Sequence, residues 1–180
     1  MKPKDRDFIE TKDGLFFCVV GYLHTPDRIT AYMKYIPSEK GKWSRGKSHY
    51  KRTLDYYHVT QVENTYNYLK ERYPKYIFKD PLRNIIISTV PKKEVKQYYH
   101  PRERARKILL NPHDVLEKKF YKIVETLQGF KDIREHIGVT GSLLTGSHNP
   151  EFSDLDVTVY GREHVREIIQ AVLNLKSENI

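Results

Sequence analysis

The sequence contains little of what anchors proteins in membranes or stabilises secreted ones. Cys18 is the only cysteine among 180 residues, which excludes an internal disulfide and a cysteine-rich zinc site. No apolar run approaches the roughly 18 residues that suggest a membrane span, and the charged N-terminus does not lead into the apolar region of a secretory signal. These absences predict a cytoplasmic protein with no membrane partner, in which Cys18 is a buried apolar residue.

Two common catalytic arrangements are also missing from the sequence. The eight histidines include no His-x-x-x-His pair of the kind that binds a metal from one helix face. Ser142 does not lie in the Gly-x-Ser-x-Gly setting of a hydrolase nucleophile. The sequence therefore gives no support to a zinc protease or to a Ser/His/Asp hydrolase.

The net charge of +9 is unevenly distributed along the chain. Residues 1–110 contain 24 Lys and Arg against 12 Asp and Glu, whereas residues 111–180 contain 8 against 11. A basic N-terminal part favours nucleic acid as a partner. A solvated basic face and a docking surface for an acidic protein remain open as alternatives, and abundant Lys, Glu, Ile and Tyr also fit an archaeal or other thermophile.

The N-terminal part is predicted to be β-rich. Residues 15–23, with Gly21 as a bulge, and residues 29–36 form an antiparallel hairpin, and residues 56–59 and 84–90 are further strands. A helix is expected from Thr60 until Pro74 ends it. The basic segment 37–47 has two interpretations: a mobile loop whose Trp43 stacks on a base, or a solvated loop whose Trp43 packs on the domain.

The C-terminal part begins with a predicted helix over residues 101–110. A second helix is expected with Asn111 as its N-cap and Pro112 in its first turn, and with Gly129 as its C-cap. A short buried strand then includes Val139 and Thr140. This pattern predicts two domains, a β-rich basic one over residues 1–98 and a second over residues 99–180.

The chemistry-bearing residues form one motif near the C-terminus. Gly141 and Ser142 begin a small-residue turn in which backbone amides and a hydroxyl can approach a phosphate. Asp154 and Asp156 then begin a predicted strand, residues 154–160, whose apolar residues face the other way. A separation of two residues places the aspartate Cα atoms about 6.6 Å apart, so that both carboxylates can share one or two divalent ions.

This motif resembles the signature of the DNA polymerase β-type nucleotidyltransferase superfamily, especially its minimal archaeal and bacterial members. The resemblance covers about the last 70 residues. It implies an α+β protein in which the β-rich basic domain precedes a partial polymerase β-type nucleotidyltransferase α/β domain. It also implies a transferase that uses Mg²⁺, with two ions in the complete site. Gly141 and Ser142 would contact the nucleoside triphosphate, and Asp154 and Asp156 would be the catalytic metal ligands.

One departure from the superfamily bears on activity. The third carboxylate of the superfamily lies on a strand beyond the helix expected over residues 162–175, and only five residues follow that helix here. Either this sequence is truncated and the site is incomplete and inactive, or the protein lacks the carboxylate that would act as general base. Glu163 and Glu167 lie on that helix and are not assigned the role. Three hypotheses therefore stay open: transfer of a nucleoside monophosphate to RNA or DNA, transfer to a protein or small molecule, and a noncatalytic nucleic-acid-binding or regulatory protein with a relic transferase fold. His148, in the loop between the glycine turn and the aspartates, is interpreted as a surface loop residue, and a contact with phosphate or substrate is the alternative.

Overall fold

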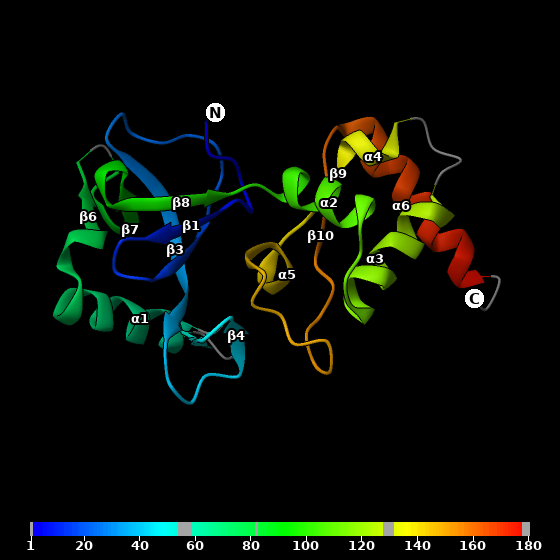
Figure 1. Ribbon diagram of the computed structural model, residues 1–180. Coiled ribbons are helices and arrows are strands. Elements are labelled where there is room, and N and C mark those ends of the chain that lie inside the picture. Colours follow the sequence, from blue (N-terminus) through cyan, green and yellow to red (C-terminus); the bar gives the residue numbers. More distant parts are fainter. Residues whose placement is uncertain (1, 54–58, 82, 128–131, 178–180) are drawn as a thin grey trace. The chain divides into compact units, whose positions relative to one another are not determined.

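A computed structural model describes residues 2–53, 59–81, 83–127 and 132–177. The chain divides into two compact units, Met1–Tyr99 and His100–Ile180 (Figure 1). Within the described ranges, the first unit contains eight strands and the second is mainly helical. The fold is therefore mixed α/β with an antiparallel sheet. Among the described residues, no helix is both long and apolar enough to cross a membrane.

The first unit is built on an antiparallel sheet with the strand order β4-β5-β3-β2-β1-β8. β7 also pairs with β3 and with β6. The strands are β1 (Phe8–Thr11), β2 (Phe16–Val19), β3 (Arg28–Pro37), β4 (Trp43–Arg45), β5 (Ser48–Arg52), β6 (Ile77–Asp80), β7 (Ile85–Pro91) and β8 (Val95–Tyr99). Every residue of β1 and β2 is buried, and most of β3 alternates between buried and half-buried positions. The core of this unit therefore lies around the central strands.

The predicted hairpin is confirmed, because β2 and β3 pair antiparallel with Phe16 opposite Tyr35. The predicted bulge at Gly21 is wrong. β2 ends at Val19, and Gly21 adopts a φ of 68° in the connection that follows. Glycine tolerates this left-handed conformation better than any other residue. Gly21 therefore turns the chain after the strand has ended.

The basic segment 37–47 includes part of a hairpin. Trp43 on β4 lies opposite Tyr50 on β5. The Trp43 ring lies 5.7 Å from the Tyr35 ring, and the Arg52 guanidinium lies 4.6 Å from the Trp43 ring centre. The hypothesis of a mobile loop with a free base-stacking tryptophan is thus wrong here. Packing against aromatic neighbours orders the segment.

The helix predicted from Thr60 is present as α1 (Val59–Arg72), and a 3₁₀ turn, Pro74–Tyr76, follows it. Leu69 of α1 is fully buried in the core of the unit. The strand predicted over residues 56–59 is not seen at Val59, which begins α1, and its other residues lie outside the described part of the chain. A second 3₁₀ turn, Lys92–Glu94, connects β7 to β8.

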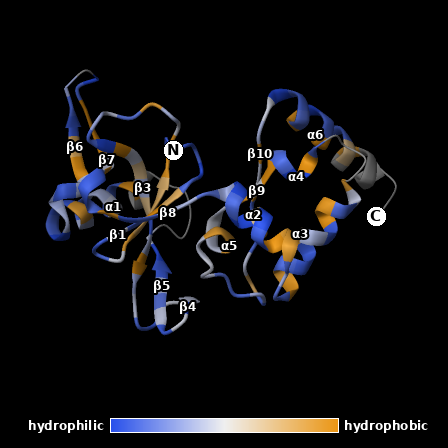
Figure 2. Ribbon diagram, turned by 45° about the horizontal axis from the view of Figure 1, so that its top comes forward, coloured by the Kyte–Doolittle hydropathy of each residue, from blue (hydrophilic) through white to orange (hydrophobic). Residues whose placement is uncertain are grey.

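The second unit contains helices around a two-stranded antiparallel pair. Its elements are α2 (Pro101–Leu110), α3 (Val115–Thr126), α4 (Ile133–His136), β9 (Ile137–Val139), α5 (Gly141–Thr145), β10 (Val157–Val159) and α6 (Arg162–Ser177). Apolar and polar residues alternate along α3 (Figure 2), and the apolar side chains Leu116, Phe120 and Val124 are buried. These side chains pack with α2, β9 and α5 residues in one core cluster.

The predicted start of the second helix is wrong. α3 begins at Val115, and its N-cap is Asp114, whose carboxylate accepts hydrogen bonds from the amides of Leu116 and Glu117. Asn111 instead ends α2, because its amide donates to Lys107 O. Aspartate is as good an N-cap as asparagine, so local preference alone does not choose between the two. The predicted C-cap, Gly129, lies outside the described residues.

Candidate functional site

The β9–β10 pair brings the two halves of the sequence motif together. Val157 lies opposite Val139 in the antiparallel register. One residue beyond this pair, the Thr140 amide donates a 2.9 Å hydrogen bond to Asp156 O. Backbone hydrogen bonds therefore hold the start of the glycine turn, Gly141, beside the segment that contains Asp156.

Gly141 allows a very close approach between these halves. Its φ is +66°, and a Cβ at this position would lie 2.5 Å from Asp156 Oδ2. Real Cβ atoms do not tolerate such a distance, and L-residues rarely adopt this φ. The positive φ favours glycine at this position, and a Cβ there would force the exposed Asp156 carboxylate to move away. The Asp156 carboxylate lies directly against the turn that precedes it in the sequence.

The aspartates lie just ahead of β10. The predicted strand over residues 154–160 is wrong at both ends, since β10 comprises only Val157–Val159 opposite the three residues of β9. Leu155 packs against the core cluster of the unit, whereas Asp154 and Asp156 are both exposed. Val157, which was expected to face inward, is 38% exposed. The predicted alternation of outward-facing polar and inward-facing apolar side chains therefore holds from Asp154 to Asp156 but not through β10.

The glycine turn forms the short helix α5. Ser142 is only 4% exposed. Its carbonyl oxygen accepts hydrogen bonds from the Ser147 amide at 3.0 Å and from Thr145 Oγ1 at 3.1 Å. Gly146 ends α5 with a φ of 68°. The turn is thus closed on itself by its own hydrogen bonds, and the buried Ser142 is less accessible than a freely exposed phosphate-binding serine would be.

The residues present fit a hard divalent cation. Asp154 and Asp156 supply carboxylate oxygens, which are the protein ligands that Mg²⁺ prefers. Within the described residues, no Lys, Arg or His forms an ion pair with either carboxylate. Two neighbouring exposed carboxylates without a protein cation can accept a metal ion and the oxygens of a polyphosphate in its place.

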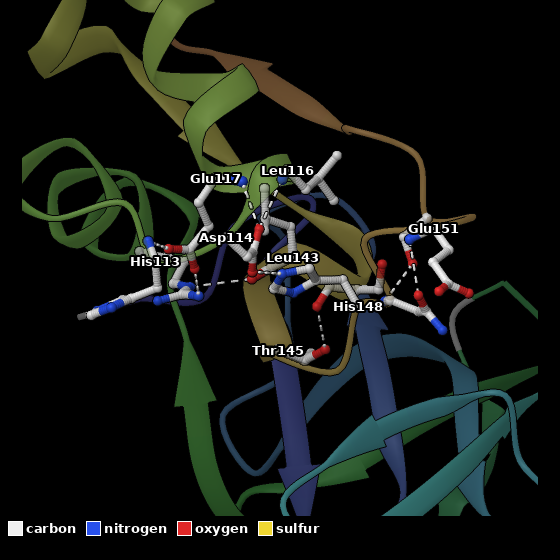
Figure 3. A network of polar contacts seen from close by, with 12 residues as sticks. His113, Asp114, Leu116, Glu117, Leu143, Thr145, His148 and Glu151 are labelled. Atoms are coloured by element: carbon white, nitrogen blue, oxygen red, sulfur yellow. Dashed lines mark hydrogen bonds and ion pairs between the residues drawn. The ribbon is translucent and has the colours of Figure 1, made fainter.

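A polar network that the sequence did not predict lies beside α5. Asp114 Oδ2 accepts a 2.7 Å hydrogen bond from His148 Nε2, and Asp114 Oδ1 caps α3 (Figure 3). Burial raises the pKa of Asp114, but hydrogen bonds from the Glu117 amide and the His148 imidazole more than offset this, so the pKa is lowered. The hypothesis that His148 is a surface residue is wrong, because its side chain is only 8% exposed.

The network continues from Asp114 to α2. Glu117, whose side chain is 3% exposed, accepts a 2.8 Å hydrogen bond from the His113 amide and forms an ion pair with Arg104. Arg104 Nε donates a 3.2 Å hydrogen bond to Leu143 O on α5. No local pattern reveals this network, since His148 is 34 residues from Asp114 in the sequence.

The three side chains of Asp114, Glu117 and His148 offer ligand atoms within 4.8 Å of one another, so they form a candidate metal cluster. Each of them is already hydrogen-bonded. Asp114 accepts from two amides and from His148, while Glu117 accepts from an amide and pairs with Arg104. The charged guanidinium compensates the buried carboxylate, which reduces the attraction for a further cation.

The comparisons with known proteins agree with the sequence motif. Residues 117–180 match the family model described as nucleotidyltransferase domain, which confirms the resemblance predicted for the C-terminal part. The chain is 29% identical over 183 residues to Uncharacterized protein MJ1086 of Methanocaldococcus jannaschii. The match covers 99% of this chain and 54% of the relative, so the chain spans about half the length of the curated relative it matches. No solved structure matches.

Proposed function

We propose that this protein is a Mg²⁺-dependent nucleotidyltransferase. The single observation that carries the proposal is the approach of the Asp156 carboxylate to Gly141, with 2.5 Å between Oδ2 and the position of a Cβ. This approach supports the proposal because it brings one proposed metal ligand against the proposed phosphate-binding turn. The match of residues 117–180 to the nucleotidyltransferase domain supports the same reaction class.

In the proposed reaction, a hydroxyl oxygen of the acceptor attacks the α-phosphorus of a nucleoside triphosphate. A new O–P bond forms, the bond between the α-phosphorus and the pyrophosphate oxygen breaks, and the hydroxyl proton passes to solvent water. Gly141 and Ser142 bind the triphosphate through the turn, and Asp154 and Asp156 hold Mg²⁺. The bound ion would neutralise phosphate charge and assist the attacking hydroxyl. The β9–β10 register holds the Asp156 backbone beside the turn, which would contribute to catalysis through positioning.

The acceptor is proposed to be RNA or DNA, on the basis of the charge distribution. The excess of Lys and Arg lies in residues 1–110, and such an excess attracts polyanions. The same chemistry on a protein or small-molecule hydroxyl is the alternative acceptor class. A noncatalytic nucleic-acid-binding or regulatory protein is the second candidate function, favoured by the same charge distribution.

A transfer assay tests the proposal. The chain is incubated with a nucleoside triphosphate labelled at its α-phosphate, with Mg²⁺ and with RNA, DNA, protein or small hydroxyl acceptors in parallel. We expect label transfer that requires Mg²⁺ and is lost in Asp154→Asn/Asp156→Asn. Equal transfer by both proteins contradicts the assignment. Nucleic-acid binding without transfer, unchanged by the double substitution, favours the noncatalytic function.

A further inference from the structure

The loop from Gly141 to His148 is attached to the helices of the second unit at two points. At its start, Leu143 O on α5 accepts a 3.2 Å hydrogen bond from Arg104 Nε on α2. At its end, His148 Nε2 donates a 2.7 Å hydrogen bond to Asp114 Oδ2 ahead of α3. Neither attachment uses the residues proposed to contact the nucleotide or the metal ion.

The two attachment points are linked to each other through Glu117. One carboxylate oxygen of Glu117 pairs with Arg104, and the other accepts the His113 amide at 2.8 Å. The Glu117 amide in turn donates a 2.9 Å hydrogen bond to Asp114 Oδ1. The path Leu143, Arg104, Glu117, Asp114, His148 is therefore continuous and connects the two attachment points of the loop. Figure 3 shows its part from Glu117 through Asp114 to His148. We name these five residues the loop clamp.

Two polar side chains of the loop clamp are buried. The side chains of Glu117 and His148 are 3% and 8% exposed, so water cannot readily replace their partners, and a buried group that loses its partner is costly. Between the attachment points, the Ser147 amide and Thr145 Oγ1 both donate to Ser142 O. The loop thus has internal hydrogen bonds as well as anchored ends.

We propose that His148 is a positioning residue, which acts through Asp114 and the loop clamp to hold the Gly141–Ser142 turn in its binding conformation. This inference rests on the proposed nucleotide site. A turn that is already ordered loses less conformational entropy when a triphosphate binds. His148 therefore contributes to nucleotide affinity without touching the nucleotide.

The test uses the whole chain and three variants. His148→Leu removes the donor to Asp114, and His148→Gln restores an N–H donor. His113→Leu is the matched control, because the exposed His113 contributes only its backbone amide to the network. Two quantities are measured for each protein: the affinity for a fluorescent ATP analogue with Mg²⁺, and the hydrogen-exchange rates of the Gly146 and Ser147 amides.

We expect His148→Leu to weaken nucleotide binding about tenfold, which corresponds to about 1.4 kcal/mol spent on ordering the turn when the nucleotide binds. The Gly146 and Ser147 amides should exchange faster in the same variant. His148→Gln should recover most of both effects, and His113→Leu should show neither. Unchanged affinity and exchange in His148→Leu would overturn the proposal.

Two further outcomes distinguish this inference from the proposed nucleotide-binding function and from a metal site. If the unsubstituted chain binds no nucleotide, the proposed function fails and His148 loses its role in binding. Altered amide exchange would then establish only a structural clamp. Stoichiometric Zn²⁺ binding that both His148→Leu and His148→Gln abolish would assign Asp114, Glu117 and His148 to a metal site and overturn the positioning role.

Discussion

The Asp156 carboxylate lies where a side chain at Gly141 would begin: Oδ2 is 2.5 Å from the position of a Cβ there. The β9–β10 register and the hydrogen bond from the Thr140 amide to Asp156 O hold the Asp156 backbone beside Gly141. Because of this close approach, a side chain at position 141 is expected to displace the Asp156 carboxylate, which we propose as a metal ligand.

Gly141→Ala is expected to destabilise the protein by about 1 to 3 kcal/mol, the cost of a strained backbone conformation, and to displace the Asp156 carboxylate. Mg²⁺-dependent nucleotide binding should weaken with it. Gly146→Ala is the control, because Gly146 also has a positive φ but a Cβ there meets nothing within 4 Å. Chemical denaturation and nucleotide titration measure both effects. Equal loss of nucleotide binding in the two variants would contradict the importance of the approach to Asp156.

The sequence motif predicted the two segments but not this relationship. It indicated one strand at Val139 and another over residues 154–160 without predicting that they pair, and it assigned the close approach at Gly141 to a phosphate rather than to Asp156. The strand ends were wrong because β9 has only three residues, so the ladder cannot extend to Asp154 or Tyr160. The spacing of apolar residues within one segment does not reveal how long its partner strand is.

The loop clamp could not be predicted from local patterns. Asn111 and Asp114 are both residue types that favour the N-cap position. In the folded chain Asp114 is the N-cap, and its carboxylate also accepts a hydrogen bond from His148, which is distant in the sequence. In the first unit, the position of β8 beside β1 joins residues from opposite ends of the unit's sequence, as in the pairing of Phe8 with Tyr99. Long-range pairing of this kind depends on the whole sheet rather than on any segment.

Arg104→Met is expected to destabilise the chain by about 3 to 5 kcal/mol, because it leaves the buried Glu117 carboxylate without its cation. Arg106→Met is the matched control. Arg106 pairs with Glu135 at the surface, where both side chains are more than half exposed, and such pairs contribute less than about 1 kcal/mol. Urea unfolding measures both variants. Similar unfolding midpoints would refute the structural importance of the buried pair.

Glu10 makes the stability of the first unit dependent on pH. Burial raises its pKa, but hydrogen bonds from Lys96, Tyr99 and Arg45 outweigh this, so the folded pKa lies below the ordinary value of 4.5. A carboxyl group whose pKa is lower in the folded state stabilises the fold fully at pH values above the pKa that it has in the unfolded chain. This stabilisation is lost as the pH falls through the pKa of the folded state.

Glu10→Gln should therefore cost stability at neutral pH and progressively less as the pH falls below 4.5. Glu39→Gln is the control at an exposed position. The difference in unfolding free energy between Glu10→Gln and the unsubstituted chain is measured by urea titration across this range. A difference that does not change with pH would show that the ionised Glu10 carboxylate is not what stabilises the fold.

Binding of single-stranded RNA is predicted to depend on the lysines around β4. Lys40, Lys42 and Lys47 are exposed, and removing a lysine that binds a phosphate should reduce the slope of log affinity against log salt by about 1. The triple change to glutamate should thus weaken binding and flatten its salt dependence. The same change at the exposed Lys118, Lys119 and Lys122 of α3 is the control. An equal reduction of affinity in both triple variants would indicate a general charge effect without a binding surface.

The most direct measurement is the titration of the chain with ATP in the presence and absence of Mg²⁺, beside Asp154→Asn/Asp156→Asn. Asparagine keeps the size of each side chain and removes the charge that holds a hard cation. The account predicts saturable binding that requires Mg²⁺ and is lost in the double variant, with an unfolding midpoint close to that of the unsubstituted chain. Binding of equal strength by both proteins, or binding that does not respond to Mg²⁺, would contradict a nucleotide and metal site at Gly141, Ser142, Asp154 and Asp156.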